Sequence, residues 1–153
     1  MVGGTGTLAQ TGRNALTAAA HFGLHCPVAL GAAQTVRGIP FTWAQDAGAN
    51  GANNLTLPWE GGRSFDPRPA WELMYETAVQ EGGALQILCL GPLTNLARAL
   101  EEHPDLPQYI QRVVFSAGSV SLTENGAVAG VGNDANGPAD PAALQKGLAS
   151  GPP

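Results

Sequence analysis

Apolar residues recur at three- and four-residue intervals along much of the chain, and this spacing predicts amphipathic helices. The predicted helices span residues 7–22, 67–81, 93–100, 107–111 and 141–148. Thr7 and Asp66 are candidate caps of the first two, and Gly82-Gly83 ends the second. Asp140-Pro141 opens the last helix.

Short apolar runs between these helices predict strands over residues 27–30, 85–90 and 113–115. The second run, Leu-Gln-Ile-Leu-Cys-Leu, is typical of a strand that is covered on both faces. Because strands and helices alternate, we predict an α/β fold with an open, mostly parallel sheet flanked by helices. The sheet is small, and the chain begins and ends at a helix. We therefore expect residues 1–153 to form a single partial domain, incomplete at both ends.

Two glycine-rich, polar segments, 32–68 and 118–138, follow the first and third predicted strands. In α/β folds, ligands bind at the loops that follow the carboxyl ends of the strands. The first segment carries Phe41, Trp43 and Trp59. These rings could stack on a planar ligand, or they could fold the loop onto the domain, and the sequence leaves both readings open.

The overall composition excludes several classes of protein. Hydrophobic residues make up 44% of the chain, which suits a packed core, and charged residues only 12%. Seven Lys and Arg against twelve Asp and Glu disfavour binding to nucleic acid. No apolar run approaches the roughly 18 residues of a membrane span, and residues 1–6 do not resemble a secretory leader.

The cysteines and histidines offer no catalytic motif. Cys26 and Cys89 each lie in an apolar segment, so we expect two buried free thiols, which weakly favours a cytoplasmic location. His21, His25 and His103 lie near predicted helix ends, and none stands in a nucleophile motif with Ser or Cys.

Two glycine-containing motifs resemble ligand loops only superficially. Residues 4–9 match G-x-G-x-x-G/A, but no strand precedes them and no acid follows at the required distance, so we expect a flexible entry to a helix. Residues 133–137 resemble a calcium loop without its flanking helices and closing Glu. They nevertheless bring oxygen-bearing side chains together after a strand, in a site or in a solvated turn: Asn133, Asp134, Asn136 and Asp140.

Taken in order, four segments of the chain resemble the inosine-uridine-preferring nucleoside hydrolase family. The strongest is Leu-Cys-Leu-Gly-Pro-Leu-Thr-Asn-Leu-Ala at 88–97, which is similar to the family's ALGPLTNLA. Residues 7–15 resemble its T-x-x-x-x-x-R-N-A helix, and 27–32 its PVAAGA strand end. Residues 132–143 resemble its AEFN…DPEAA segment.

The resemblance implies hydrolysis of the N-glycosidic bond of purine or pyrimidine ribonucleosides to ribose and free base, with a bound calcium ion. It makes the backbone carbonyl of Leu90 a metal ligand and Asn136 a hydrogen-bonding contact to the ribose. Asp134 stands where the family usually has Glu, which is another ribose contact, and its side chain is shorter. The implied partner is a small-molecule ribonucleoside.

Other family features do not match this chain. The acidic cluster D-x-D-x-x-x-D-D would precede Met1, and a later metal-binding Asp and leaving-group His would follow Pro153. Where the family shows H-G-x-D-G-L-G, residues 47–53 read AGANGAN, so the His is replaced. We therefore expect this chain alone to lack a catalytic base, to hold no calcium and to be inactive. The alternatives are a non-catalytic nucleoside- or sugar-binding module and a purely structural or misassembled fragment.

The low charge content has a physical explanation if parts of the domain are absent. Helix faces carrying Leu96-Ala97 and residues 18–20 would then be partly uncovered. This predicts poor solubility or self-association, and a homo-oligomer is possible.

Overall fold

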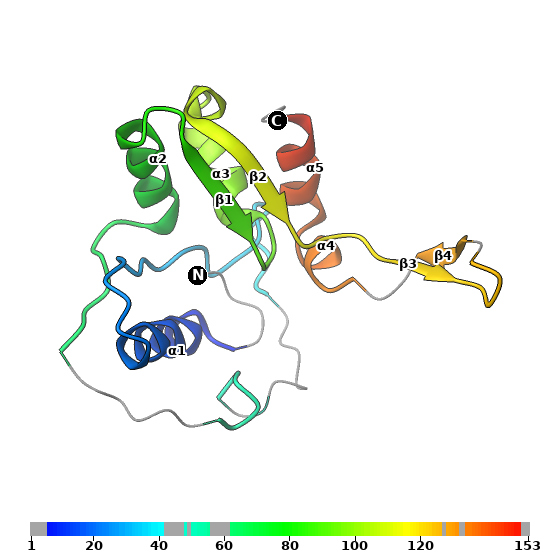
Figure 1. The fold of residues 1–153 in the computed structure, drawn as a ribbon, viewed down its shortest axis with the longest axis horizontal. Coiled ribbons are helices and arrows are strands. Elements are labelled where there is room, and N and C mark those ends of the chain that lie inside the picture. The colour runs from blue at the N-terminus through cyan, green and yellow to red at the C-terminus, as the bar shows by residue number, and fades with distance from the viewer. Residues whose placement is uncertain are drawn as a thin grey trace.

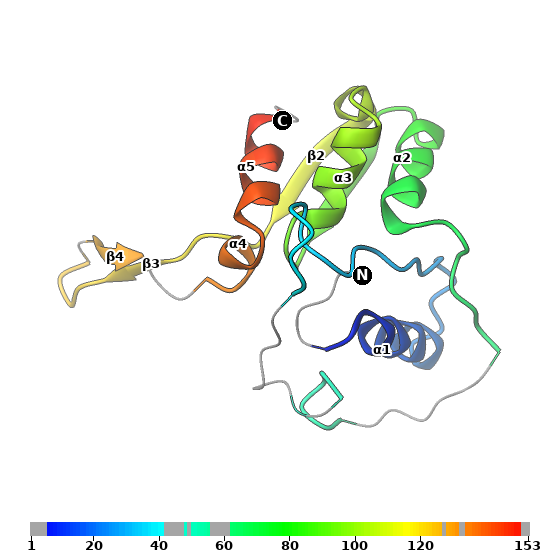
Figure 2. The same ribbon diagram turned by 180° about the vertical axis from the view of Figure 1, so that it is seen from behind.

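A computed structural model of the chain describes residues 6–41, 48, 50–55, 62–126, 128–131 and 134–150. Its centre is a parallel pair of strands, β1 (Leu85–Cys89) and β2 (Ile110–Phe115). Three helices lie along one face of this pair (Figures 1 and 2): α2 (Ala70–Gln80), α3 (Thr94–Glu102) and α5 (Pro141–Ala149). The predicted α/β class with a small parallel sheet is confirmed.

The sheet is covered by helices on one face. Along β1, partly buried and exposed residues alternate, and Leu88 and Val114 are paired neighbours on the open face. Their exposed fractions are 64% and 47%, and that of Leu90, just beyond β1, is 73%. The prediction that 85–90 is covered on both faces is therefore wrong for the described chain. A strand that is buried on both faces needs a covering layer on each side, and the described helices cover only one side.

The core lies between the sheet and the helices. The main cluster joins α2, α3, the 3-10 turn η2 (Leu106–Tyr109) and β2: Ala78, Leu96, Ala99, Leu100, Leu106 and Ile110. A second cluster joins Leu93 and Ala97 to Ala143 of α5. Leu96 and Ala97 are 2% and 0% exposed. The expectation that their helix face is uncovered is thus wrong, because α2 and α5 pack on either side of α3.

Helix α1 (Leu8–His21) begins as predicted, with the Thr7 hydroxyl accepting from the Gln10 N–H at 3.0 Å. It packs closely against the segment after it, since a Cβ on Gly12 would lie 2.6 Å from Leu30 Cδ2. The predicted strand 27–30 forms only an isolated parallel bridge, Ala29 with Asp66. The Asp66 N–H donates to the Val28 carbonyl at 2.9 Å.

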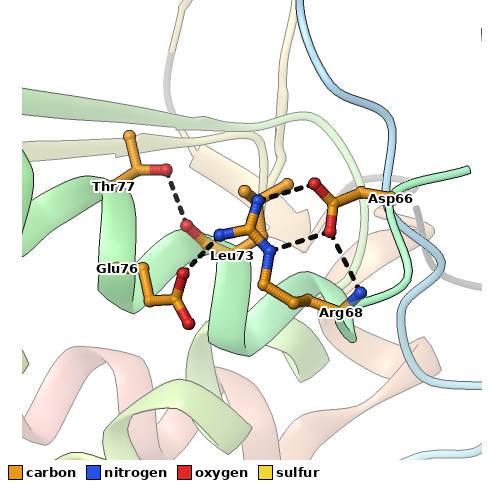
Figure 3. Close-up of polar contacts among 5 residues, drawn as sticks. All are labelled: Asp66, Arg68, Leu73, Glu76 and Thr77. Atoms are coloured by element: carbon orange, nitrogen blue, oxygen red, sulfur yellow. Dashed lines mark hydrogen bonds and ion pairs between the residues drawn. The ribbon is translucent and has the colours of Figure 1, made fainter.

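Asp66 does not cap α2, which begins at Ala70 with Pro69 before it and no side-chain cap. The Asp66 carboxylate instead accepts from the backbone N–H and the guanidinium of Arg68, at 2.6–3.0 Å (Figure 3). The same guanidinium is ion-paired with Glu76 of α2. Through these hydrogen bonds, Arg68 lowers the pKa of Asp66 to about 2. The acid therefore fixes the turn before the helix rather than the helix terminus.

The second polar segment is not a plain loop. It contains an antiparallel hairpin, β3 (Val120–Leu122) and β4 (Val128–Val131), which projects away from the sheet in both views (Figures 1 and 2). A short helix, α4 (Asn136–Ala139), then leads into α5, which begins at Asp140-Pro141 as predicted. The Asp140 carboxylate caps α5 by accepting from the Ala143 N–H. The sequence does not predict these two strands, because each is too short to show a clear alternation of apolar and polar residues and glycines lie among them.

Several smaller expectations have mixed outcomes. Cys26 is exposed, contrary to prediction, whereas Cys89 is partly buried and burial raises the pKa of its thiol. His21 and His103 do lie at helix ends. Phe41 is buried, but Trp43 and Trp59 lie outside the described residues. Within the described chain, no helix is long and apolar enough to cross a membrane.

Candidate functional site

The candidate site lies where β1 and β2 end, because parallel strands place their carboxyl ends at the same edge of a sheet. Asn136, the first residue of α4, reaches this edge from the far end of the 118–138 segment. Its side-chain Nδ2 donates to the carbonyl of Ser116 at 2.7 Å and to that of Leu90 at 3.3 Å. The structure thus brings together Asn136 and Leu90, two residues predicted for the site.

Asp134, the third predicted site residue, lies beside Asn136 and accepts backbone hydrogen bonds. One carboxylate oxygen accepts from the Gly118 N–H at 2.8 Å and the Gly137 N–H at 3.2 Å, and the other from the Asn136 N–H at 3.0 Å. These donors, Gly118 first, lower the pKa of Asp134. Its carboxylate therefore stays ionised and anchors the turn that leads into α4.

Asp140 belongs to the core rather than to the site. It is 1% exposed, and its carboxylate accepts from the Thr94 hydroxyl at 2.8 Å and from the Val36 N–H at 2.9 Å. It thereby joins the segment after Leu30 to the amino ends of α3 and α5. Asn133, the fourth oxygen-bearing residue of the predicted group, lies outside the described residues.

Sequence reasoning did not single out Ser116 or Asn95, which complete this edge of the fold. Ser116 follows β2 and supplies a carbonyl to Asn136. The Asn95 side-chain oxygen accepts from the Ala32 N–H at 2.9 Å, which ties the segment after Leu30 to α3. Their positions in the chain could have indicated this role, because Ser116 directly follows a strand and Asn95 lies in the first turn of a helix that follows a strand.

The described residues at this edge do not by themselves supply the ligands of a calcium ion. Calcium takes six to eight oxygen ligands. Here Leu90 offers one carbonyl, which already accepts from the Asn136 amide, and the Asp134 oxygens face N–H groups. Among the described residues, no group of three His, Cys, Asp or Glu could hold a metal ion. The Asn136 amide can hydrogen-bond a hydroxyl-rich ligand, whereas the Asp134 oxygens accept from backbone N–H groups and Asp140 is buried.

The fold and the site define a class: an α/β protein whose polar loops gather at the carboxyl ends of parallel strands. The sequence profile of the inosine-uridine preferring nucleoside hydrolase family matches residues 1–153. The chain belongs to this family.

Similar proteins agree with this assignment. The chain is 35% identical over 102 residues to probable uridine nucleosidase 1 of Oryza sativa, covering 62% of this chain and 31% of that protein. It is 30% identical over 118 residues to the non-specific ribonucleoside hydrolase RihC of Escherichia coli, covering 77% of this chain and 38% of that one. The solved purine-preferring ribonucleoside hydrolase from Gardnerella vaginalis superposes with a TM-score of 0.86 and 25% identity. That alignment covers 99% of this chain and 48% of the solved one, so the chain spans less than half the length of these proteins.

Proposed function

We propose that residues 1–153 form one partial domain that supplies the ribose-facing part of a ribonucleoside hydrolase site. The parent reaction is hydrolysis of the N-glycosidic bond of purine or pyrimidine ribonucleosides to ribose and free base. One observation carries the proposal: the Asn136 amide lies between the Leu90 and Ser116 carbonyls at the shared end of β1 and β2. Asn136 is the proposed ribose contact, and the ligand is a small-molecule ribonucleoside rather than a nucleic acid.

We further propose that these 153 residues alone do not turn over a nucleoside. Attack by water requires a carboxylate that can take its proton. The Asp134 carboxylate accepts hydrogen bonds from three backbone N–H groups, and the buried Asp140 carboxylate accepts one from the Thr94 hydroxyl. The test is release of ribose from inosine and uridine by the purified chain, with and without calcium, beside the Escherichia coli hydrolase as positive control. No release is expected from this chain, and calcium-dependent turnover would overturn the proposal.

A second candidate function is non-catalytic binding of a nucleoside or sugar. It is favoured by the way Asn136 is held, since its backbone N–H and its side-chain amide donate to protein oxygens. Calorimetric titration with inosine and uridine, with and without calcium, separates the two. Calcium-independent binding without turnover supports the binding module, whereas binding that requires calcium supports the hydrolase site and contradicts our proposal that this chain holds no calcium.

A further inference from the structure

We propose that Asp134 is a positioning residue, which holds Asn136 between the ends of β1 and β2 without the help of a divalent cation. The inference rests on the proposed function, in which Asn136 contacts the ribose. It departs from the resemblance to the family, which would make Asp134 a second ribose contact and Leu90 a calcium ligand.

The first step is the direction of the Asp134 carboxylate. Its three hydrogen bonds come from Gly118 on the connection that follows β2 and from Asn136 and Gly137 in α4. Sixteen positions in the chain separate Asp134 from Gly118. The side chain therefore joins the end of β2 to the start of α4. Its oxygens are directed at backbone, and a ribose hydroxyl would have to displace one of these donors.

The second step is the length of the side chain. An Asp carboxylate can accept the N–H two residues further on, which is a common turn-forming hydrogen bond. A Glu is longer by one methylene and loses this geometry. Gly137 fits the same arrangement, since a Cβ there would lie 2.5 Å from Asp134 Oδ2. Asp at 134 and Gly at 137 together form a compact turn.

The third step is the consequence for Asn136. With its backbone N–H bonded to Asp134, its Nδ2 group reaches two carbonyls, those of Ser116 and Leu90. Both amide hydrogens are used in this way, so a ribose hydroxyl would donate to Oδ1. A cation approaching the Leu90 carbonyl would meet the positive side of the amide group. The hydrogen-bonded amide takes the place that the resemblance gives to calcium.

The test is NMR of the ¹⁵N-labelled full chain, without nucleoside and with EDTA. The side-chain amide of Asn136 is assigned by its loss in Asn136→Ala. We expect two well-separated hydrogen signals that exchange slowly with water. Asp134→Glu and Asp134→Asn should speed this exchange at least about tenfold, which corresponds to ~1.4 kcal/mol. Gly137→Ala should do the same with the charge intact.

Glu124→Gln, which removes one exposed carboxylate on the hairpin, is the matched control and should change nothing. The proposal is overturned if Asp134→Glu and Gly137→Ala behave like Glu124→Gln, or if calcium chloride shifts the Asn136 signals to saturation. The fold is intact in Asp134→Glu and Gly137→Ala if the other cross-peaks keep their positions in both spectra.

Inosine titration of the same samples keeps this inference distinct from the proposed function. Weaker inosine binding by Asp134→Glu, with Glu124→Gln unchanged, supports Asp134 acting through Asn136. If the unsubstituted chain binds neither inosine nor uridine, the proposed function fails, while the exchange rates of Asn136 still decide whether Asp134 positions it.

Discussion

At the residue scale, three aspartates of this chain accept hydrogen bonds from backbone N–H groups and so hold local turns in place. Asp66 accepts the Arg68 N–H, Asp134 accepts three N–H groups, and Asp140 accepts those of Val36 and Ala143. For Asp66 and Asp134, these donors lower the pKa of the carboxyl group, which makes each carboxylate a weaker base. The acids near the candidate site are therefore suited to fixing geometry rather than to moving protons.

Asp66 allows a prediction about pH. Its pKa in the folded chain is about 2, lowered from 3.8 chiefly by the Arg68 side chain. A lowered carboxyl pKa contributes stability that is fully present above about pH 4 and is lost as the pH falls toward about 2. We expect ¹³C NMR to show the Asp66 carboxyl titrating near the lower value. Arg68→Leu should return the pKa to its ordinary range, and a midpoint near 4 in the unsubstituted chain would contradict the assignment.

At the scale of elements, the burial of α3 follows directly from the spacing of its apolar residues. Its apolar spacing places Leu96, Ala97 and Leu100 on buried faces, where they meet α2, η2, the sheet and α5. The strand β1 shows the opposite case. Its run of apolar residues predicts burial on both faces, yet Leu88 is exposed on the face away from α3.

This contrast can be tested by paired substitutions. Leu96→Ala should lower the free energy of unfolding by about 2–5 kcal/mol, because it removes a fully buried side chain. Leu88→Ala should cost less than about 1 kcal/mol, since Leu88 is 64% exposed. Urea unfolding followed by circular dichroism measures both. Equal losses in the two variants would show that the open face of β1 is covered in solution.

At the scale of the whole molecule, three of the ten large hydrophobic residues exposed in the described chain lie together at the sheet. Leu88, Leu90 and Val114 lie near one another at the ends of β1 and β2, while the face carrying Leu96 and Ala97 is covered. Self-association remains a prediction for this chain, but the surface expected to mediate it is the open face of the sheet rather than α3.

We expect the apparent mass in light scattering to rise with protein concentration. Replacing Leu88 and Val114 with Lys should lower it toward 15.6 kDa, the mass of one chain, by introducing charge repulsion on the open face. Leu122→Lys, on the exposed hairpin, is the control and should leave the concentration dependence unchanged. A monodisperse monomer before any substitution would refute this prediction.

The sequence by itself determined the α/β class, the positions of α1, α3 and α5, and the family, because periodic spacing, caps and ordered motifs are local properties of the chain. It also named Leu90, Asp134 and Asn136. Only the tertiary structure decided that Asn136 meets the Leu90 carbonyl, that Asp134 faces backbone N–H groups and that Asp140 is buried. Those outcomes depend on which segments far apart in the chain come within hydrogen-bonding distance, and on which face of a strand a helix covers. Neither is encoded in local spacing.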